Sequence, residues 1–186
     1  MRTKQTSDPA NYPVSLQEVK EFLKVDDTNS DAEILSLIGA ATDHAEALCN
    51  RPFINREFQA TFDSFPRCIE LSQTPVQSVD LVEYVDTDGA TQTLAATEYQ
   101  VDLGNNFRKA RIVEAYNKTY PSTRSEMNAV TVTFTAGYGA DWNSVPDTIK
   151  TTIKYLVSHY FINRSADGKV PEMIEMLLAG EKVHAL

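Results

Sequence analysis

The chain has 186 residues, of which 42% are hydrophobic and 23% are charged, as is ordinary for a globular domain. Its formal net charge is −9. Tight binding to a DNA surface uses clustered Lys and Arg, so this charge argues against a DNA-binding protein. No apolar run reaches the roughly 20 residues that a transmembrane helix needs, and no signal peptide is recognisable, so we expect no membrane association.

The N-terminal residues 1–14 are mostly polar, and a flexible arm is predicted for them. Ser15 and Glu18 have the spacing of a capping box, in which each side chain bonds the backbone amide of the other residue. Apolar residues follow at helical spacing as far as Leu23. A short helix is therefore predicted to begin at Ser15.

A second, longer helix is predicted from Ser30, its expected cap, to Cys49. Asn50 and Pro52 are expected to end it. Its apolar face recurs at three- and four-residue steps, which predicts that one side of the helix is buried. This face consists of Ile34, Leu37, Ile38, Ala41, Ala45 and Leu48.

Between residues 56 and 135 the hydrophobic period changes from helical to alternating, which is typical of half-buried strands. Turn residues separate the alternating runs, and Asp86–Gly89 is typical of a hairpin. The predicted strands are Glu57–Phe62, Cys68–Leu71, Val79–Val85, Thr91–Leu94, Tyr99–Leu103, Arg111–Ala115 and Val130–Thr135.

Gly137 and Gly139 follow the last of these strands and are interpreted as a structural hinge, because glycine adopts backbone angles that other residues avoid. Ser144 and Asp147 have capping-box spacing, and Pro146 suits the first turn of a helix. The helix that follows is predicted to form much of the core. Its apolar stripe is Ile149, Ile153, Leu156, Val157, Tyr160 and Phe161.

A strand, a glycine loop and a helix can also hold a phosphate group. The dinucleotide fingerprint needs a third glycine, and Trp142 occupies that position. A Walker loop needs Gly-Lys-Ser/Thr, which the chain lacks. A structural turn is therefore favoured over a nucleotide site.

The C-terminal residues 168–186 contain a narrow apolar stripe of Met173, Ile174, Leu177 and Leu178. Helices shorter than about 12–15 residues are marginal in water, so this one needs a surface to pack on. Its own domain and a partner subunit are the two alternatives.

No residues suited to catalysis, cofactor binding or metal binding stand out. His44, His159 and His184 lie far apart, and no histidine or cysteine spacing matches a zinc site. The acidic segment between the first two helices lacks the glycine and glutamate of a calcium loop. Cys49 and Cys68 are expected to be reduced thiols.

These elements predict an α+β fold. Helices within 15–50 and 146–164 would pack as a small bundle, with a central antiparallel β-rich module at 56–135. The resulting domain would span 15–167 and be followed by a short helical tail at 168–186.

Several short motifs also occur in a particular order and spacing between residues 15 and 164. They are Ser15–Leu23, Cys49–Phe53, Asp63–Pro66, Ile69–Leu71, Pro75–Val79, Val82–Asp86, Asp88–Gly89, Thr93–Leu94, Tyr99–Asp102, Asn128–Val132, Ala136–Gly139, Val145–Pro146, Ile149–Lys150, Leu156–Val157 and Tyr160–Arg164. Taken together, they resemble the head–tail connector, or adaptor, proteins of long-tailed bacteriophages.

The resemblance implies a structural virion protein and not an enzyme. Such a connector would form a ring of its own copies, expected to be dodecameric, beneath the portal protein of the virion neck, after assembly in the host cytoplasm. It would dock the stopper or tail proteins and surround DNA that passes as cargo. The C-terminal stripe of Met173, Ile174, Leu177 and Leu178 is the candidate portal interface, ordered on docking.

Three alternatives remain open. The chain could be a stopper or tail-completion protein of the same neck. It could be a small enzyme with an unrecognised site at the Gly137 loop, or an oligomeric scaffold with no phage role.

Overall fold

The computed structural model describes residues 1–163 and 172–182. Its contacts divide the chain into two units. The β unit contains Met1–Pro9 and Asn55–Gly137, and the helical unit contains Ala10–Ile54 and the chain from Tyr138 onward. Helices and antiparallel sheets are both present, so the predicted α+β class is confirmed.

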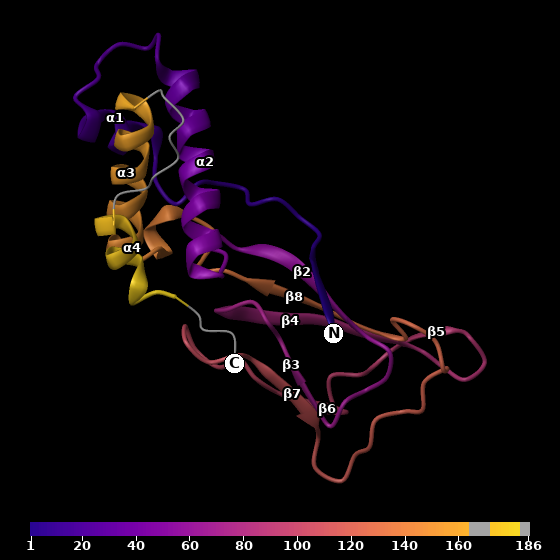
Figure 1. Cartoon of the computed structure of the whole chain (residues 1–186). Helices are drawn as coiled ribbons and strands as arrows, with labels where there is room; N and C mark the ends of the chain where they lie inside the picture. Colours follow the sequence, from indigo (N-terminus) through magenta and orange to yellow (C-terminus); the bar gives the residue numbers. More distant parts are fainter. Residues whose placement is uncertain (164–171, 183–186) are drawn as a thin grey trace. The chain divides into compact units, whose positions relative to one another are not determined.

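The larger sheet of the β unit has the strand order β1-β2-β8-β4-β5, and all of its neighbouring strands are antiparallel (Figure 1). Its strands are β1 (Arg2–Gln5), β2 (Arg56–Phe62), β8 (Val130–Ala136), β4 (Val76–Val85) and β5 (Thr91–Thr93). The smaller antiparallel sheet has the order β3-β7-β6. Its strands are β3 (Cys68–Glu70), β7 (Arg111–Glu114) and β6 (Tyr99–Asp102).

Apolar side chains from both sheets form the core of the β unit. On β8, Val132, Phe134 and Ala136 are fully buried, and the Phe134 ring stacks on Phe58 of β2 with centroids 5.7 Å apart. Alternate residues of a strand point to one face, which explains why the alternating runs of the sequence became strands. The other buried members are Ala60, Ile69, Leu71, Val76, Val82, Leu94, Ala110 and Ile112.

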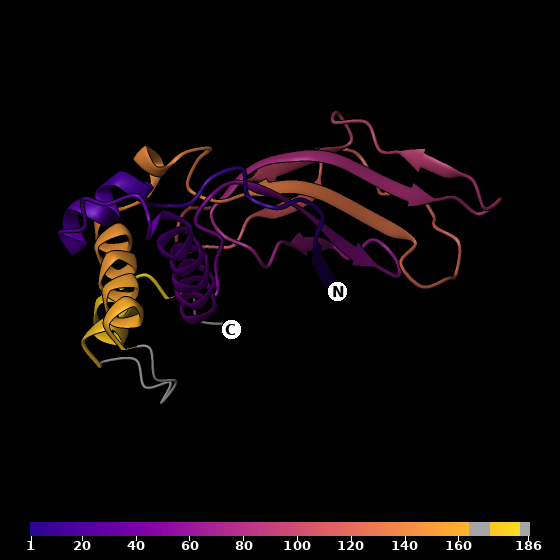
Figure 2. The same ribbon diagram turned by 90° about the horizontal axis from the view of Figure 1, so that it is seen from above.

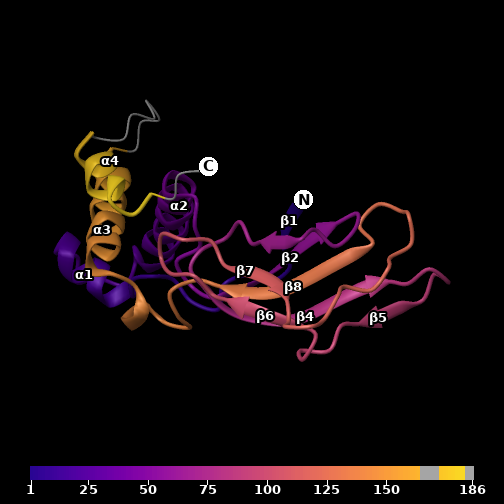
Figure 3. The same cartoon turned by 90° about the horizontal axis from the view of Figure 1, so that it is seen from below.

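The N-terminal residues differ from the prediction of a flexible arm. Arg2–Gln5 forms β1, which pairs with β2 at the edge of the larger sheet (Figure 3). This strand carries no apolar alternation, because it contributes backbone hydrogen bonds and its side chains are mainly exposed. Hydrophobic periodicity indicates which residues are buried, so it does not predict a strand whose side chains are mainly exposed.

The helical unit is built around a helix, α3, that contacts each of the other α-helices of the unit. Its elements are α1 (Leu16–Leu23), α2 (Asp31–Cys49), the 3₁₀ turn η1 (Trp142–Ser144), α3 (Asp147–Ile162) and α4 (Glu172–Ala179). Figure 2 shows α2 and α3 side by side.

The first helix begins as predicted. The Glu18 amide donates to Ser15 Oγ at 3.2 Å, and the Ser15 amide donates to the Glu18 carboxylate at 3.0 Å. Ser30 is the N-cap residue of α2, as predicted, but its side chain makes no capping hydrogen bond. Instead the Asp27 carboxylate accepts from the amides of Asn29 and Ser30.

The capping box predicted for α3 is wrong. Ser144 belongs to η1, and the cap residue of α3 is Pro146, which has no capping side chain. The Asp147 carboxylate pairs with Lys150 Nζ at 2.7 Å and does not reach back to Ser144. The Asp141 carboxylate caps η1 by accepting from the Asn143 amide at 2.9 Å.

The apolar stripe of α3 faces the core of the helical unit. Ile149, Ile153, Leu156 and Val157 are fully buried, and Tyr160 and Phe161 pack against them half-buried. Their partners include residues of α1, α2 and α4, namely Val19, Ile34, Ile38, Ala41, Ala45, Ile174 and Leu178. Helix α3 therefore supplies the common surface on which the other helices pack.

We predict that Ile153→Asp abolishes cooperative unfolding of the helical unit. Burying an unpaired carboxylate is strongly unfavourable, and losing the isoleucine contacts adds about 2 kcal/mol or more. Thermal unfolding followed by helical circular dichroism checks this expectation. Thr148→Asp is the matched control, because Thr148 is exposed in the first turn of α3, where a negative charge is favourable. A normal melt of Ile153→Asp would refute the core assignment.

Candidate functional site

The glycine loop joins the end of β8 to the start of η1. Gly137 has φ +141°, a value that disfavours residues with a side chain. Its amide donates to the Pro75 carbonyl at 2.9 Å, and its carbonyl accepts from Gln77 Nε2 at 2.7 Å. The next amide, of Tyr138, donates to the Phe53 carbonyl at 3.0 Å. Both amides are engaged with the protein, so they are not presented to a phosphate group.

Gly139 is required for a different reason. It forms an isolated bridge with Ile54, and a Cβ at this position would collide with the Cβ and Oγ of Ser144. The two glycines therefore let the chain pass closely by its own backbone and side chains. This geometry agrees with the interpretation of the loop as a structural turn.

A buried guanidinium links three segments of the helical unit. The Arg51 side chain is fully buried and donates from Nη1 to the Tyr138 hydroxyl at 2.6 Å. The Tyr138 hydroxyl donates to Glu181 Oε2 at 2.9 Å, and Arg51 Nη1 lies 3.6 Å from the same oxygen. Arg51 follows α2, Tyr138 lies in the glycine loop and Glu181 follows α4, so this cluster joins the C-terminal helix to the rest of its unit.

Burial raises the pKa of Tyr138 to about 12, and the Glu181 carboxylate also raises it, while Arg51 lowers it. The hydroxyl therefore stays protonated over the ordinary pH range and donates to Glu181 throughout. The cluster consists of an arginine, a neutral phenol and a carboxylate that contact one another. This arrangement is structural.

Helix α4 places the four predicted interface residues in different environments. Ile174 and Leu178 are 1% and 2% exposed and belong to the core of the helical unit, and Leu177 is half-buried. Met173 is 50% exposed, and Met176, which the prediction did not include, is 76% exposed. Residues three apart share a helix face, so Met173 and Met176 form the outward apolar face. Their spacing in the sequence shows that they share a face but not that this face is exposed.

Two arginines that lie close together in the sequence, Arg108 and Arg111, share one carboxylate partner. Arg108 and Arg111 each bind the Asp102 carboxylate, at 3.2 and 2.9 Å. The hydrogen bond from Arg111 and that from the Gly104 amide hold the pKa of Asp102 below its usual range. These contacts with Asp102 organise the exposed loop that follows β6.

Within residues 1–163 and 172–182, no group of three or more His, Cys, Asp or Glu side chains could hold a metal ion. His44 Nδ1 lies 3.2 Å from the Tyr160 hydroxyl, and His184 lies outside the described residues. Cys49 and Cys68 are free thiols, and burial raises the pKa of Cys49 to about 11. Among the described helices, none is both long and apolar enough to span a membrane.

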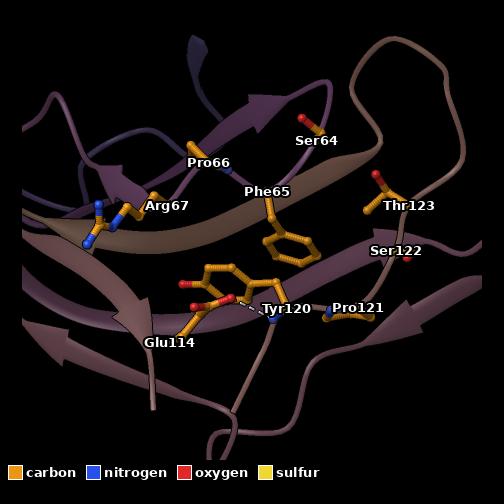
Figure 4. Close-up of a pocket in the computed structure, with 9 residues that line it drawn as sticks. All are labelled: Ser64, Phe65, Pro66, Arg67, Glu114, Tyr120, Pro121, Ser122 and Thr123. Carbon is orange, nitrogen blue, oxygen red and sulfur yellow. Dashed lines mark hydrogen bonds between the residues drawn. The ribbon is translucent and has the colours of Figure 1, made fainter. Parts of the chain in front are cut away.

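The β unit contains a groove that the sequence did not predict. Its volume is about 490 Å³, and the Phe65 and Tyr120 rings stack in it with centroids 4.5 Å apart (Figure 4). The Tyr120 amide donates to Glu114 Oε1 at 2.9 Å, and burial, with Glu114 as a smaller cause, raises the pKa of Tyr120 to about 12. These contacts fix the loop that follows β7. The remaining lining residues are Ser64, Pro66, Arg67, Pro121, Ser122 and Thr123.

We predict that Gly139→Ala destabilises the helical unit by about 1–3 kcal/mol, the usual cost of overpacking, because the new methyl group collides with Ser144. Adding Ser144→Gly removes both colliding atoms and should restore most of the loss. Denaturant unfolding of the two single variants and the double variant measures this coupling. Strictly additive losses would show that the collision is not the cause.

We also predict a pH effect of Tyr138. Its folded pKa of about 12 lies above that of an unfolded tyrosine, about 10. The stabilisation linked to its proton is therefore complete below about pH 10 and is lost as the pH rises through about 12. In Tyr138→Phe, the free energy of unfolding should decrease less between about pH 10 and 12 than in the wild type. Denaturant titration measures this difference. Tyr116→Phe, at an exposed tyrosine, is the control, and equal slopes for wild type and Tyr138→Phe would contradict the assignment.

Comparisons with known proteins bear on this arrangement. A family model described as head completion protein matches residues 14–170, most of the chain. A search of curated proteins found none that matches.

Similar chains occur in three solved structures of a gene transfer agent (GTA). The neck of the empty GTA particle, computed with C6 symmetry, has a chain with TM-score 0.79 and 22% identity. The virion of the native particle has one with TM-score 0.80 and 20% identity. The neck of the native particle, computed with C12 symmetry, has one with TM-score 0.78 and 21% identity. Each alignment covers 100% of this chain and 97% of the other.

At these identities the solved structures establish a shared fold over the whole length of the chain. The family model covers all of the motifs between residues 15 and 164, and it confirms the resemblance to head–tail connector proteins. The chain belongs to the head completion protein family.

Proposed function

We propose that this chain is a structural head–tail connector that forms a closed ring beneath the portal of a virion neck and docks the stopper or tail. The observation that carries the proposal is the family match over residues 14–170. The shared fold with chains from neck structures computed with C6 and C12 symmetry supports a ring, and C12 symmetry supports twelve copies.

A closed ring of identical copies needs two different contact surfaces on each copy. The helical unit exposes an aromatic pair suited to one of them. Phe22 of α1 and Tyr155 of α3 meet edge to face at 5.4 Å, and both are more than a third exposed. Exposed aromatic residues are enriched at protein interfaces, so this pair supports a ring body built from the helices.

The outward face of α4 is the proposed portal contact. Ile174 and Leu178 hold α4 on its own unit, and Glu181 adds the link to Arg51. This leaves Met173 and Met176 exposed on a helix that is already positioned. Methionine side chains adapt to irregular surfaces, as docking to a second protein requires.

The negative net charge of the chain supports a ring that surrounds DNA without binding it. The formal net charge is −9, and Arg108 and Arg111 are engaged with Asp102. An acidic surface repels phosphates, so DNA would cross the ring as cargo without binding to it.

Coexpression with the portal protein of the same particle, followed by electron microscopy, tests the proposal. We expect a ring of this chain on the portal. A stopper would instead bind only after another protein had covered the portal, so binding that requires a third component would favour the stopper. Failure to bind any neck component would refute the connector function.

We predict that the double substitution Met173→Asp/Met176→Asp weakens portal binding at least tenfold without lowering the melting temperature. Burial of each large apolar side chain contributes about 1.5–3 kcal/mol, and about 1.4 kcal/mol corresponds to a factor of ten. Pull-down titration with portal and a thermal melt give the two readouts.

Glu175→Gln, at an exposed position of the same helix, is the control and should bind as the wild type does. Truncation at Asp167 should also abolish portal binding, but it removes the buried Ile174 and Leu178 and therefore lowers stability as well. Full affinity of either the double variant or the truncated chain would eliminate the C-terminal helix as the portal contact.

A further inference from the structure

Strand β1, like β5 at the opposite edge, differs from the inner strands of the larger sheet in how it is held. Its four residues are Arg2, Thr3, Lys4 and Gln5, and three of the four are exposed. None of them belongs to the apolar core of the β unit. Burial of apolar area, the dominant favourable term in folding, therefore contributes almost nothing to keeping β1 in place.

Backbone hydrogen bonds with β2 hold β1 instead. The antiparallel register runs from Arg2 opposite Thr61 to Gln5 opposite Phe58, and the Thr6 amide continues it by donating to the Glu57 carbonyl at 3.0 Å. Each such bond contributes only about 0.5–1.5 kcal/mol net.

Polar side chains supplement this ladder. Thr3 Oγ1 lies 2.9 Å from Ser72 Oγ, Thr6 Oγ1 donates to Glu57 Oε1 at 2.7 Å, and the Glu57 amide donates to Ser7 Oγ at 2.8 Å. These partners, Ser72, Glu57 and strand β2, all lie in the β unit of the same chain. An identical segment from a second copy would make the same bonds, so exchange between copies would cost no contacts.

The path of the chain makes such an exchange feasible. Met1–Pro9 belongs to the β unit, whereas the chain from Ala10 to Ile54 belongs to the helical unit. The stretch from Thr6 to Ser15 holds neither helix nor strand and spans roughly 33 Å when extended.

The chain is held in place again at Asn11, immediately after the β unit ends at Pro9. Asn11 Nδ2 donates to the Ala140 carbonyl at 3.2 Å within the helical unit. Pro9 has a fixed φ and biases Asp8 towards extended backbone. A change in backbone angles between Ser7 and Asn11 is therefore enough to redirect β1 while both units remain folded.

A strand at the edge of a sheet exposes unpaired backbone groups that can pair with another chain. Without β1, strand β2, which carries the buried Phe58 and Ala60, would be such an edge. In a closed ring, each copy can give its β1 to one neighbour and receive β1 from the other, so that every β2 stays covered.

We propose that in the assembled oligomer β1 pairs with β2 of the adjacent copy of this chain, while in the free chain it pairs with its own β2. The occupant of the β2 edge is thus a second copy of the same chain. This proposal rests on the ring assembly proposed above. The exchanged strand would tie neighbours together through the β units, separately from contacts between helices.

Disulfide trapping in the portal-bound assembly tests the exchange. Arg2 and Thr61 are opposite in the register, and opposed residues of antiparallel strands lie within the distance that a disulfide spans. The test chain carries Arg2→Cys and Thr61→Cys, with Cys68→Ser to remove the less buried native thiol. Cys49 can stay, because it is fully buried.

The matched control pairs Thr61→Cys with Thr131→Cys in the same Cys68→Ser background. Thr131 lies opposite Thr61 on the other side of β2, in β8. Because β8 contributes core residues of the β unit, it cannot be exchanged without unfolding. This control must give a disulfide within one chain in the free and the assembled protein alike.

We expect oxidation of the assembly to produce a ladder of covalently linked chains on a denaturing, non-reducing gel, while the control migrates as single chains. The free test chain should give the single-chain product. A ring that forms on the portal but yields only single chains would overturn the exchange and leave the ring intact. Absence of any ring would overturn both proposals, and the mass of the assembly before denaturation distinguishes the two failures.

Discussion

The helical unit depends on a guanidinium that water does not reach. Arg51 follows α2 and binds Tyr138 of the glycine loop and Glu181 after α4. A buried charge without partners costs several kcal/mol, so the contact of these three segments, which are distant in the sequence, stabilises the folded unit. Together with the burial of Ile174 and Leu178, this interaction positions α4 and with it the apolar side chains of α4 that remain exposed.

Stability is distributed unevenly over the chain, and the distribution suits an assembly protein. Helix α3 and strand β8 are buried along one or both faces, so they provide rigid supports. Strand β1 and the outward face of α4 bury little apolar surface. Segments with few buried contacts open at low cost, which makes them the parts that can change partners while the cores stay intact.

Much of the fold was predictable, because hydrophobic period reports which faces are buried. The strands β2 to β8 and the helices α1 to α3 follow the predicted runs closely. The two capping errors have a common physical cause. The Ser30 side chain makes no capping bond and Ser144 lies in η1. The Asp27 carboxylate binds the amides just before α2, and Asp141 caps η1. Spacing alone does not tell which of several nearby acceptors reaches an amide.

By itself, the sequence determined the α+β class and the connector resemblance, because both depend on local periodicity and on short motifs in order. Only the tertiary structure decided that Ile174 and Leu178 turn inward while Met173 and Met176 face outward. It also decided that the polar N-terminus is a strand. These outcomes depend on partners far away in the chain, namely α3 for α4 and β2 for β1, and local sequence carries no record of such distant contacts.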